Sequence, residues 1–325
     1  MAESLFVSHC TIDALARAAR ALKQGNLVAF PTETVYGLGA DANNEKAVSR
    51  IYKVKGRPQD HPLIVHIGDW QQMGQWAEEI PDFAIDLARA FWPGPMTLIL
   101  KRSELAEDFV TGGQDTVGIR VPDQTLALQL LNEFSKIGGK GIAAPSANRF
   151  GQVSPTTAQA VQEEIGAFLS SEDAILDGGP CAVGVESTII DCTSTNPRIL
   201  RPGAITVEDI ERATKLEAEI VEKAEIRVSG SLDSHYAPRA EVLLDVTPQP
   251  GDGLIALADT PTPSGVIRLA EPKTPESFAH LLYAALREGD SKGLNRIVVA
   301  QPQDEGISLA IRDRLKRAAS GKRTI

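Results

Sequence analysis

Cationic and imidazole side chains cluster in one short part of the sequence, between residues 50 and 66. Against a single acid, Asp60, this segment contains six potentially basic residues: Arg50, Lys53, Lys55, Arg57, His61 and His66. The excess is unusual because the whole chain carries a net charge of −10. Gly56 and Pro58 end the helical pattern, so Lys55 and Arg57 can project from extended backbone toward one polyanion. We therefore predict an anion site that binds a phosphate chain.

A simpler interpretation of the same cluster is also open. Cations near the C-terminus of a helix stabilise it by about 0.3–1 kcal/mol each, which accounts for Lys53 and Lys55. It does not account for Arg57 or for the two histidines, so we favour the anion site.

Three further segments place hydroxyl groups beside predicted strands. They are PTETVYGLG (31–39), GIAAPSANRFGQVSPTT (141–157), and VGVESTIIDC (183–192) with the following RILRPG (198–203). Hydroxyls and backbone amides between a strand and a helix suit a phosphate or a ribose, although no P-loop pattern is present. Structural interpretations stay open: a polar turn in the first segment, a helix cap at Ser154 or Thr156, and a solvated Arg201.

Composition narrows the function classes. The sequence pI of about 5.1 argues against a general nucleic-acid binder. The three cysteines, Cys10, Cys181 and Cys192, show no CxxC spacing, which indicates a reducing compartment rather than disulfides or a zinc site. No apolar run approaches the roughly 18–20 residues of a membrane span, and the N-terminus has no signal-peptide pattern. We expect a cytoplasmic protein without a membrane segment.

The elements that must position these residues follow an α/β pattern. Through residue 205 strand and helix signals alternate, with helices expected at 45–55, 82–91 and 123–136, the last one capped by Asp123. Residues 226–239 are rich in Gly, Ser and Pro, as in a linker. A strand–helix–strand pattern then predicts a small parallel sheet. The expected division is a first domain at 1–205, a linker at 206–239 and a second domain at 240–325.

Eight segments, taken together and in this order, carry a resemblance to a known family: PTETVYGLG, KGRPxxHPLIVH, FWPGPMTLIL, VGIRVP, APSANxxGxxSPT, STIID, RPG and HYAP. The chain resembles the YrdC-like family in its long, two-domain form. The resemblance implies a YrdC-like α/β domain with a twisted mixed sheet and a deep basic cavity, followed by a small Rossmann-like α/β domain. The linker would cover the cavity.

The same resemblance implies an activity. L-threonine, bicarbonate and ATP would give L-threonylcarbamoyladenylate and pyrophosphate, which is a nucleotidyl transfer. A separate transferase would use the product to modify the adenosine next to the anticodon in tRNA. Mg²⁺ would accompany ATP, held mainly by phosphates and not by protein side chains. Direct contact with tRNA would be weak or absent.

Matching positions give the expected site residues. Lys55 and Arg57 would be catalytic, since they hold the phosphates and stabilise the leaving pyrophosphate. The ATP site would comprise Lys55, Arg57, His61, Thr116, Ser146, Asn148, Ser154, Arg201 and Tyr236. The L-threonine site would comprise Thr34, His66, Arg120, Ala144 and Ser187, with Arg120 as the bidentate partner of the carboxylate.

The linker is also expected to act as a lid over the cavity, because a carbamate is labile in water. As a surface residue of that lid, Tyr236 should tolerate truncation with a stability change below about 0.5 kcal/mol. Two rival functions remain: an RNA-binding protein, which predicts salt-sensitive RNA affinity without ATP turnover, and another ATP-using carbamoyl transferase. The latter type of chain carries acylphosphatase-like and zinc-finger modules that this sequence lacks.

Overall fold

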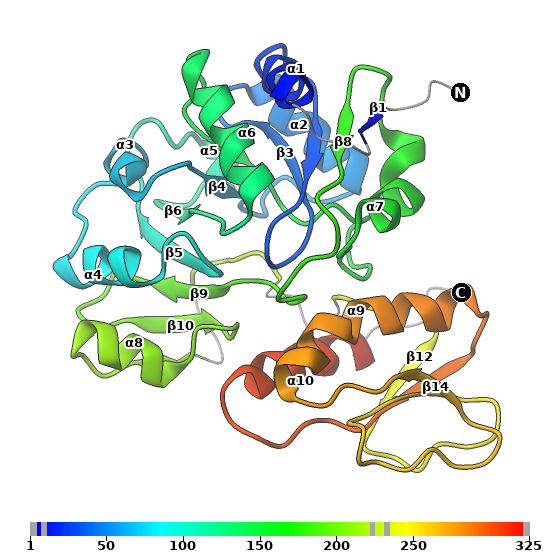
Figure 1. The fold of residues 1–325 in the computed structure, drawn as a ribbon. Helices are drawn as coiled ribbons and strands as arrows, with labels where there is room; N and C mark the ends of the chain where they lie inside the picture. Colours follow the sequence, from blue (N-terminus) through cyan, green and yellow to red (C-terminus); the bar gives the residue numbers. More distant parts are fainter. Residues whose placement is uncertain (1–4, 8–11, 222–224, 231–234, 321–325) are drawn as a thin grey trace.

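The computed structural model of the 325-residue chain describes residues 5–7, 12–221, 225–230 and 235–320. Two β-sheets organise it (Figure 1). The larger sheet has eleven strands in the order β1-β8-β2-β3-β7-β4-β6-β5-β9-β10-β11, and it is mixed: β2 runs antiparallel to β3, whereas β4 runs parallel to β6. The large mixed sheet confirms the predicted α/β class.

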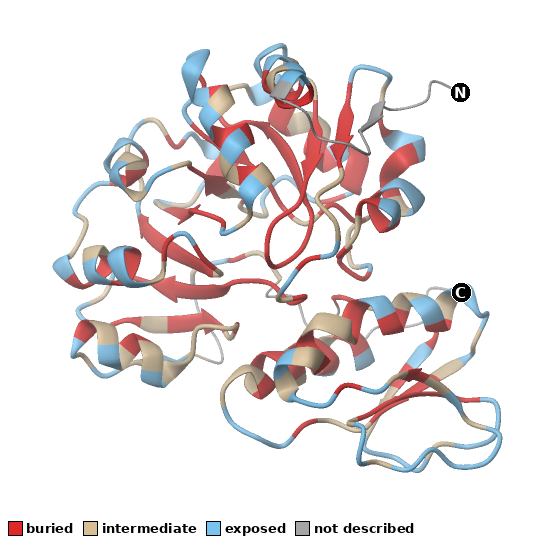
Figure 2. Ribbon diagram, viewed as in Figure 1, coloured by how far each residue is buried: buried red, intermediate tan, exposed pale blue. Residues whose placement is uncertain are grey.

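The strands of this sheet are short, and most of their residues are buried (Figure 2). In chain order they are β1 (Leu5–Val7), β2 (Val28–Phe30), β3 (Gly37–Asp41), β4 (Ile64–His66), β5 (Met96–Lys101), β6 (Thr116–Arg120), β7 (Ile142–Ala143), β8 (Ala174–Leu176), β9 (Thr188–Asp191), β10 (Arg198–Arg201) and β11 (Glu219–Ile220).

Helices cover the sheet and complete two apolar cores. One core contains residues of α1 and α6 packed on β2, β7 and β8, and the other, larger core contains residues of α2, α3, α4 and α7. The helices of this part are α1 (Ile12–Lys23), α2 (Glu45–Lys55), α3 (Met73–Trp76), α4 (Asp82–Phe91), α5 (Asp108–Thr111), α6 (Thr125–Lys136), α7 (Ala158–Ile165) and α8 (Val207–Thr214), with 3-10 turns at Trp70–Gln72 and Gly166–Phe168.

Helix α2 shows how the sequence sets up the cationic segment. The Asn44 side chain caps its first turn by accepting a hydrogen bond from the Ala47 amide, and Gly56 ends it in the left-handed region, with φ of 63°. The predicted helix at 45–55 is therefore confirmed. Because the helix ends before Gly56, Arg57 lies in non-helical backbone.

Several local expectations were wrong. Residues 37–39, expected to end a polar turn, belong to β3 and pair with β2. Gln124 caps α6 instead of Asp123, and Thr157 caps α7 instead of Ser154 or Thr156. Each case shifts a cap by one to three residues, because several neighbouring side chains can accept the same backbone hydrogen bond.

The start of the predicted linker belongs structurally to the first sheet. Helix α8 contributes Ile210 to the larger apolar core, and β11 pairs in parallel with β10. The chain therefore leaves the first sheet only after Ile220.

The second sheet has four parallel strands in the order β12-β15-β13-β14. The strands are β12 (Glu241–Leu244), β13 (Gly253–Ile255), β14 (Ile267–Ala270) and β15 (Arg296–Val299). Helices α9 (Pro275–Ser291) and α10 (Ile307–Ala319) lie on the side of this sheet that faces the first domain (Figure 1). Within the described residues, no helix is long and apolar enough to cross a bilayer.

Candidate active site

A cavity of about 520 Å³, including the open space at its mouth, lies where strand ends of the first sheet meet the linker. Nine of the predicted site residues line it: Thr34, Arg57, His66, Arg120, Ala144, Ser146, Ser187, Arg201 and Tyr236. The structure thus brings together segments that are more than 200 residues apart in the chain, from Thr34 to Tyr236.

One side of the cavity is built on the sheet. Arg120 ends β6 beside His66 at the end of β4, and the two residues are register partners. The Arg120 guanidinium donates through Nη2 to Oε1 of Glu33 over 2.6 Å, and its Nε has no protein partner. Glu33 also accepts from the Asp123 amide at 3.0 Å, which fixes the carboxylate. A preoriented guanidinium with an unused donor can bind a carboxylate.

Two hydroxyls on this side have defined hydrogen-bonding roles. The Thr32 hydroxyl donates to the Val35 carbonyl at 2.6 Å, so Thr34 Oγ1 donates to Thr32 Oγ1 at 2.9 Å. Thr34 therefore offers its lone pairs to a ligand. Ser187 Oγ pairs with Thr97 Oγ1 at 2.8 Å and also accepts from Arg201 Nη2 at 3.1 Å. These groups can recognise a hydroxyl or an ammonium group.

His66 is a neutral group in this setting. Burial, and after it the nearby Arg120 charge, lower its pKa to about 3. Its Nδ1 has no hydrogen-bond partner in the protein. A neutral imidazole that points into a polar cavity can bind an amino acid without adding positive charge.

The cavity wall also carries two further arginines, Arg57 and Arg201. Arg57 donates through Nη2 to the Pro62 carbonyl at 3.0 Å and to Ser229 Oγ at 3.3 Å, and its Nε is unpartnered. Burial lowers the Arg57 pKa to about 10, which leaves it charged at neutral pH. Arg201 is 3% exposed, which rules out the solvated arginine considered from the sequence. It donates to the Ser187 and Ser229 carbonyls.

Lys55 lies behind this wall and does not line the cavity. Its Nζ donates to the carbonyls of Ser146 and Asn148, both at 2.6 Å, and the residue is 2% exposed. Burial holds the Lys55 pKa well below its usual range, with Arg57 adding to the effect. In this conformation Lys55 fixes the loop that carries Ser146 and Asn148.

Four other predicted residues also lie outside the cavity lining. Asn148 donates to the Arg149 and Gln152 carbonyls, and its Oδ1 is unpartnered. The Ser154 hydroxyl donates to a glutamate, described below. Thr116 lines a second, small cavity that shares Ile64 and Ser229 with the first one, and the His61 ring packs edge-on against Phe150.

The linker closes the cavity through His235 and Tyr236. Their ring centroids are 4.1 Å apart, and Tyr236 stacks on Tyr283 of α9 at 5.7 Å. Tyr236 is 1% exposed, so the expectation of a surface tyrosine was wrong. Its hydroxyl has no protein partner, and it adopts a positive φ of 61°. Gly230, with φ of 84°, lies directly against that hydroxyl, where a side chain would collide. Of the linker, residues 222–224 and 231–234 lie outside the described ranges.

Sequence reasoning missed two acidic residues, Glu33 and Glu186, both of which are 6% exposed. Glu33 holds Arg120, and Glu186 lines the cavity near Arg201. Both lie within the quoted motifs, PTETVYGLG and VGVESTIID. The only signal in the sequence was an acidic residue inside an otherwise apolar or hydroxyl-rich segment. The spacing of residues alone does not predict which cation forms an ion pair with it.

Fold and cavity together define a two-domain α/β protein with a buried, arginine-lined pocket. Residues 20–203 match the Sua5/YciO/YrdC family model, described as "Telomere recombination", and residues 205–320 match the model described as "Threonylcarbamoyl-AMP synthase, C-terminal domain". The chain belongs to the Sua5/YciO/YrdC family, in the long form that carries the second domain.

Known relatives match both domains. The chain is 40% identical to the threonylcarbamoyl-AMP synthase of Pyrococcus abyssi over 95% of this chain and 94% of that protein. It is 39% identical to the protein of the same name from Bacillus subtilis, over 95% and 93%. The solved structure of P. abyssi Sua5 complexed with L-threonine superposes with a TM-score of 0.85 and 38% identity, covering 97% of each chain.

Proposed function

We propose that this protein is an L-threonylcarbamoyladenylate synthase, which converts L-threonine, bicarbonate and ATP into L-threonylcarbamoyl-AMP and pyrophosphate. The observation that carries the proposal is the cavity itself, whose wall combines polar, sheet-built groups with two further buried arginines. Full-length similarity to proteins of that name, one of them solved with L-threonine, supports it.

The chemistry requires no enzyme nucleophile. The threonine amino group combines with bicarbonate to form a carbamate and water. A carbamate oxygen then attacks the α-phosphorus of ATP, and the bond to the β-phosphate oxygen breaks to release pyrophosphate. Such a reaction depends on holding two anions together and on neutralising charge as the leaving group departs. We class the enzyme as a nucleotidyltransferase on this basis.

On the amino-acid side, Arg120 would bind the threonine carboxylate through its unused Nε. Thr34 would accept a hydrogen bond from the substrate hydroxyl or ammonium group. His66, Ala144 and Ser187 would complete the pocket. The proposal rests on the preset geometry of these groups, which are buried and held by one another.

On the nucleotide side, Arg57 and Arg201 would contact phosphates and stabilise the departing pyrophosphate. Lys55 would act with them, either by fixing the Ser146–Asn148 loop or by releasing its carbonyl contacts to reach a phosphate. Asn148, Ser154, His61, Thr116 and Tyr236 complete the proposed ATP site.

We propose that Mg²⁺ enters with ATP. Glu186 in the cavity wall and Glu33 behind Arg120 are each committed to an arginine. Within the described ranges no group of three or more potential ligands gathers into a metal site. Phosphate oxygens and water would therefore supply most of the coordination, and the ion would neutralise triphosphate charge.

The linker would serve as a lid that keeps water from the carbamate. What supports this proposal is that Tyr236 of the linker stacks on Tyr283 and that Ser229 contacts Arg57 and Arg201. Substrate binding should slow proteolysis within residues 226–239, and equal cleavage with and without both substrates would argue against a lid.

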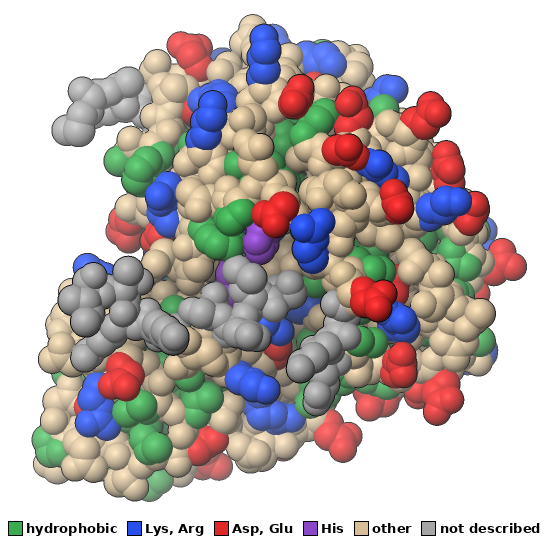
Figure 3. All heavy atoms as spheres, turned by 180° about the vertical axis from the view of Figure 1, so that it is seen from behind, with side chains coloured by type: hydrophobic (Ala, Val, Ile, Leu, Met, Phe, Trp, Pro, Cys, Tyr) green, Lys and Arg blue, Asp and Glu red, His purple; other side chains and the backbone are tan. Residues whose placement is uncertain are grey.

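The product would pass to a separate transferase that modifies tRNA, with little direct tRNA contact by this chain. On the face seen in Figure 3, basic side chains alternate with acidic ones instead of forming one basic patch. A cytoplasmic location is also part of the proposal, since Cys181 and Cys192 are free and buried.

The test is incubation of the protein with ATP, Mg²⁺ and bicarbonate, adding each amino acid in turn and measuring pyrophosphate. We expect release that depends on both threonine and bicarbonate. Salt-sensitive RNA binding without such release would instead favour the RNA-binding alternative.

A further inference from the structure

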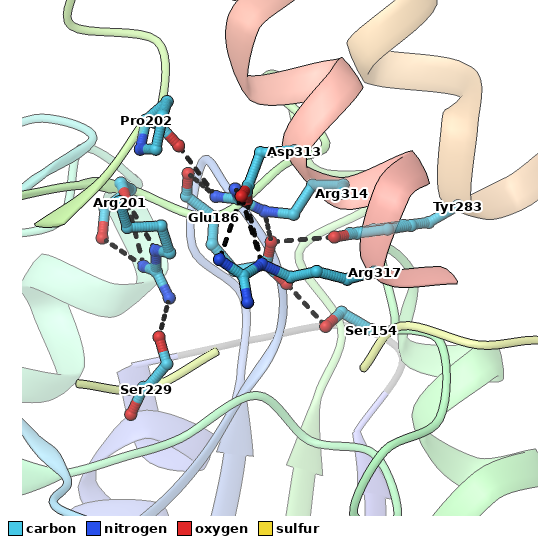
Figure 4. Close-up of polar contacts among 10 residues, drawn as sticks. Ser154, Glu186, Arg201, Pro202, Ser229, Tyr283, Asp313, Arg314 and Arg317 are labelled. Atoms are coloured by element: carbon cyan, nitrogen blue, oxygen red, sulfur yellow. Dashed lines mark hydrogen bonds and ion pairs between the residues drawn. The ribbon is translucent and has the colours of Figure 1, made fainter. Parts of the chain in front are cut away.

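A glutamate of the first domain and an arginine of the second form a buried ion pair beside the cavity. Glu186 Oε2 accepts from Arg314 Nε at 2.8 Å and from the Tyr283 hydroxyl at 2.8 Å (Figure 4). Glu186 Oε1 accepts from Ser154 Oγ at 2.6 Å. Both carboxylate oxygens are therefore occupied, and the partners come from the loop before α7, from α9 and from α10.

All members of this network are shielded from solvent. The Arg314 side chain has no exposed surface, Ser154 and Tyr283 are fully buried, and Glu186 is 6% exposed. Arg314 makes further contacts through its guanidinium, donating to the Pro202 carbonyl at 3.0 Å and to Asp313 at 2.5 Å. A buried guanidinium with this many partners is held in one position.

The network has a direct consequence for the cavity charge. Glu186 is a carboxylate in the wall of a cavity that, under the proposed function, receives a triphosphate. An unpaired carboxylate there would repel the ligand, and its burial would be costly. Burial alone would raise the Glu186 pKa, but Arg314 and then Arg201 bring it down to about 2. The second domain thus supplies the larger part of the positive charge that balances this carboxylate, and Arg201 of the first domain adds to it.

The network also fixes a predicted nucleotide contact. Ser154 lies behind the cavity wall and its hydroxyl proton is used by Glu186, so for as long as this bond holds it has only lone pairs for a ligand that reaches it. A ribose hydroxyl could donate to it, whereas a phosphate oxygen could not accept from it. Ser154 reaches this state only through a carboxylate that Arg314 holds.

We propose that Arg314 is a positioning residue for the nucleotide: acting through Glu186, it orients Ser154 and neutralises the cavity wall, so that the ATP site is complete only when the second domain is docked. This inference rests on the proposed function and deepens it. It assigns Arg314 no contact with threonine, whose proposed partners lie on the sheet.

The experiment uses the full chain with Arg314→Met, Arg314→Lys and Glu186→Gln, and measures the KM for ATP, the kcat for pyrophosphate release and the Kd for threonine alone. We expect Arg314→Met to raise the KM for ATP roughly tenfold to a hundredfold. The threonine Kd should stay within about twofold. Arg314→Lys should recover part of the loss because it keeps the charge.

The matched control is Glu164→Gln, which weakens another interdomain ion pair, between Glu164 and Arg287 at 3.2 Å, whose members do not line the cavity. A purely structural role for Arg314 would weaken both substrates alike, or would make the control behave like Arg314→Met. Either result overturns the proposal, as does an unchanged KM for ATP.

Two further arms keep the outcome decisive. If Arg314→Met does not fold, Glu186→Gln carries the test, because it preserves shape while removing the charged acceptor of Ser154. This variant leaves the Arg314 charge without the Glu186 carboxylate and so does not repel the triphosphate, which means that a selective rise in the KM for ATP reports the lost orientation of Ser154 alone. An ATP KM that does not rise in that variant refutes the inference. If the wild-type chain shows no threonine- and bicarbonate-dependent pyrophosphate release, the proposed function itself fails, which is a separate result.

Discussion

The two sides of the cavity are built in different ways. The amino-acid side consists of residues on or next to strands of one sheet, such as His66 and Arg120 on β4 and β6. The nucleotide side combines Arg201, at the end of β10 of the same sheet, with a loop, the linker and the second domain, and several of its polar groups are tied to protein partners. Lys55 binds two carbonyls, and Ser154 binds Glu186.

This difference indicates an order of events. Groups without a protein partner occur on both sides, Arg120 Nε and His66 Nδ1 on the amino-acid side and Arg57 Nε on the nucleotide side. What differs is that Lys55 and Ser154 of the nucleotide side are tied to protein partners and lie outside the cavity lining. The nucleotide side must exchange internal hydrogen bonds for contacts with ATP, which requires local movement of the linker or loop. We therefore expect threonine to bind the free protein more readily than ATP does, and four predictions test this contrast.

The largest effect should appear on the amino-acid side, in the choice of the amino-acid substrate. A site built to hydrogen-bond a hydroxyl rejects an analogue without it by roughly 10⁴-fold, so valine should be a very poor substrate. Serine lacks only a methyl group and should lose roughly 10- to 200-fold. Relative kcat/KM values from pyrophosphate release give the comparison. Faster turnover of valine than of serine would contradict a pocket that recognises the hydroxyl.

The next largest effect concerns the nucleotide side and is a change in the stability of the folded protein. Because Tyr236 is buried against Tyr283 and Arg314, Tyr236→Ala should lower the free energy of unfolding by about 3–5 kcal/mol. Tyr236→Phe is the control: it keeps the stacking and removes a hydroxyl that has no protein partner. Urea titration measures both variants. A loss below about 0.5 kcal/mol in Tyr236→Ala, the usual range for a surface change, would mean that the linker is not held as described.

Arg57→Ala and Lys55→Ala should each reduce adenylate formation by roughly tenfold to over a hundredfold, since each removes a charge-assisted interaction of about 1.5–3 kcal/mol. Threonine affinity should change little in either variant, because the amino-acid side is independent of both. Calorimetric titration with threonine provides that control and also reports folding. Near-wild-type turnover in both variants would refute the phosphate assignment.

The smallest expected effect is the change in the free energy of unfolding for each unit of pH. Burial lowers the pKa of both His66 and His235 to about 3, so the folded protein keeps them neutral where the unfolded chain, with a pKa near 6.5, binds protons. Their contribution to stability is therefore full above about pH 6.5 and is lost as the pH falls toward 3. The slope should be about 1.4 kcal/mol per pH unit for each histidine.

Denaturant titrations between pH 7 and pH 4 measure this slope. His66→Gln, on the amino-acid side, and His235→Gln, in the linker, should each reduce the slope by the contribution of one histidine. An unchanged slope in both variants would show that neither imidazole is kept neutral by folding.

How far the sequence could predict these features depended on the range of the interaction. Helix α2 follows from local signals, an asparagine cap and a terminating glycine, and it was predicted with its bounds. The grouping of Arg57 with Arg120 and Arg201 around one cavity came only from the resemblance. Lys55 was expected in the cavity, but its burial behind the wall depends on two carbonyls some 90 residues away.

The contacts between the two domains could not be predicted from the sequence either, because their partners are far apart in the chain. Glu186 and Arg314 are 128 residues apart, and each looks like an ordinary charged residue in its own segment. Tyr236 was expected at the surface because its neighbours are typical of a linker, whereas the aromatic ring that covers it belongs to α9. Long-range packing overrides local composition at these positions.

The two domains share part of one apolar core, and this has an evolutionary consequence. Val35, Val153 and Val185 of the first domain pack in the same cluster as Phe278 and Leu282 of α9. Losing the second domain would expose these valines to water. Val35 also lines the cavity and is tied to the site. A lineage reduced to the first domain alone should therefore have acquired polar residues at positions 153 and 185, and these two should vary together with the presence or absence of the second domain.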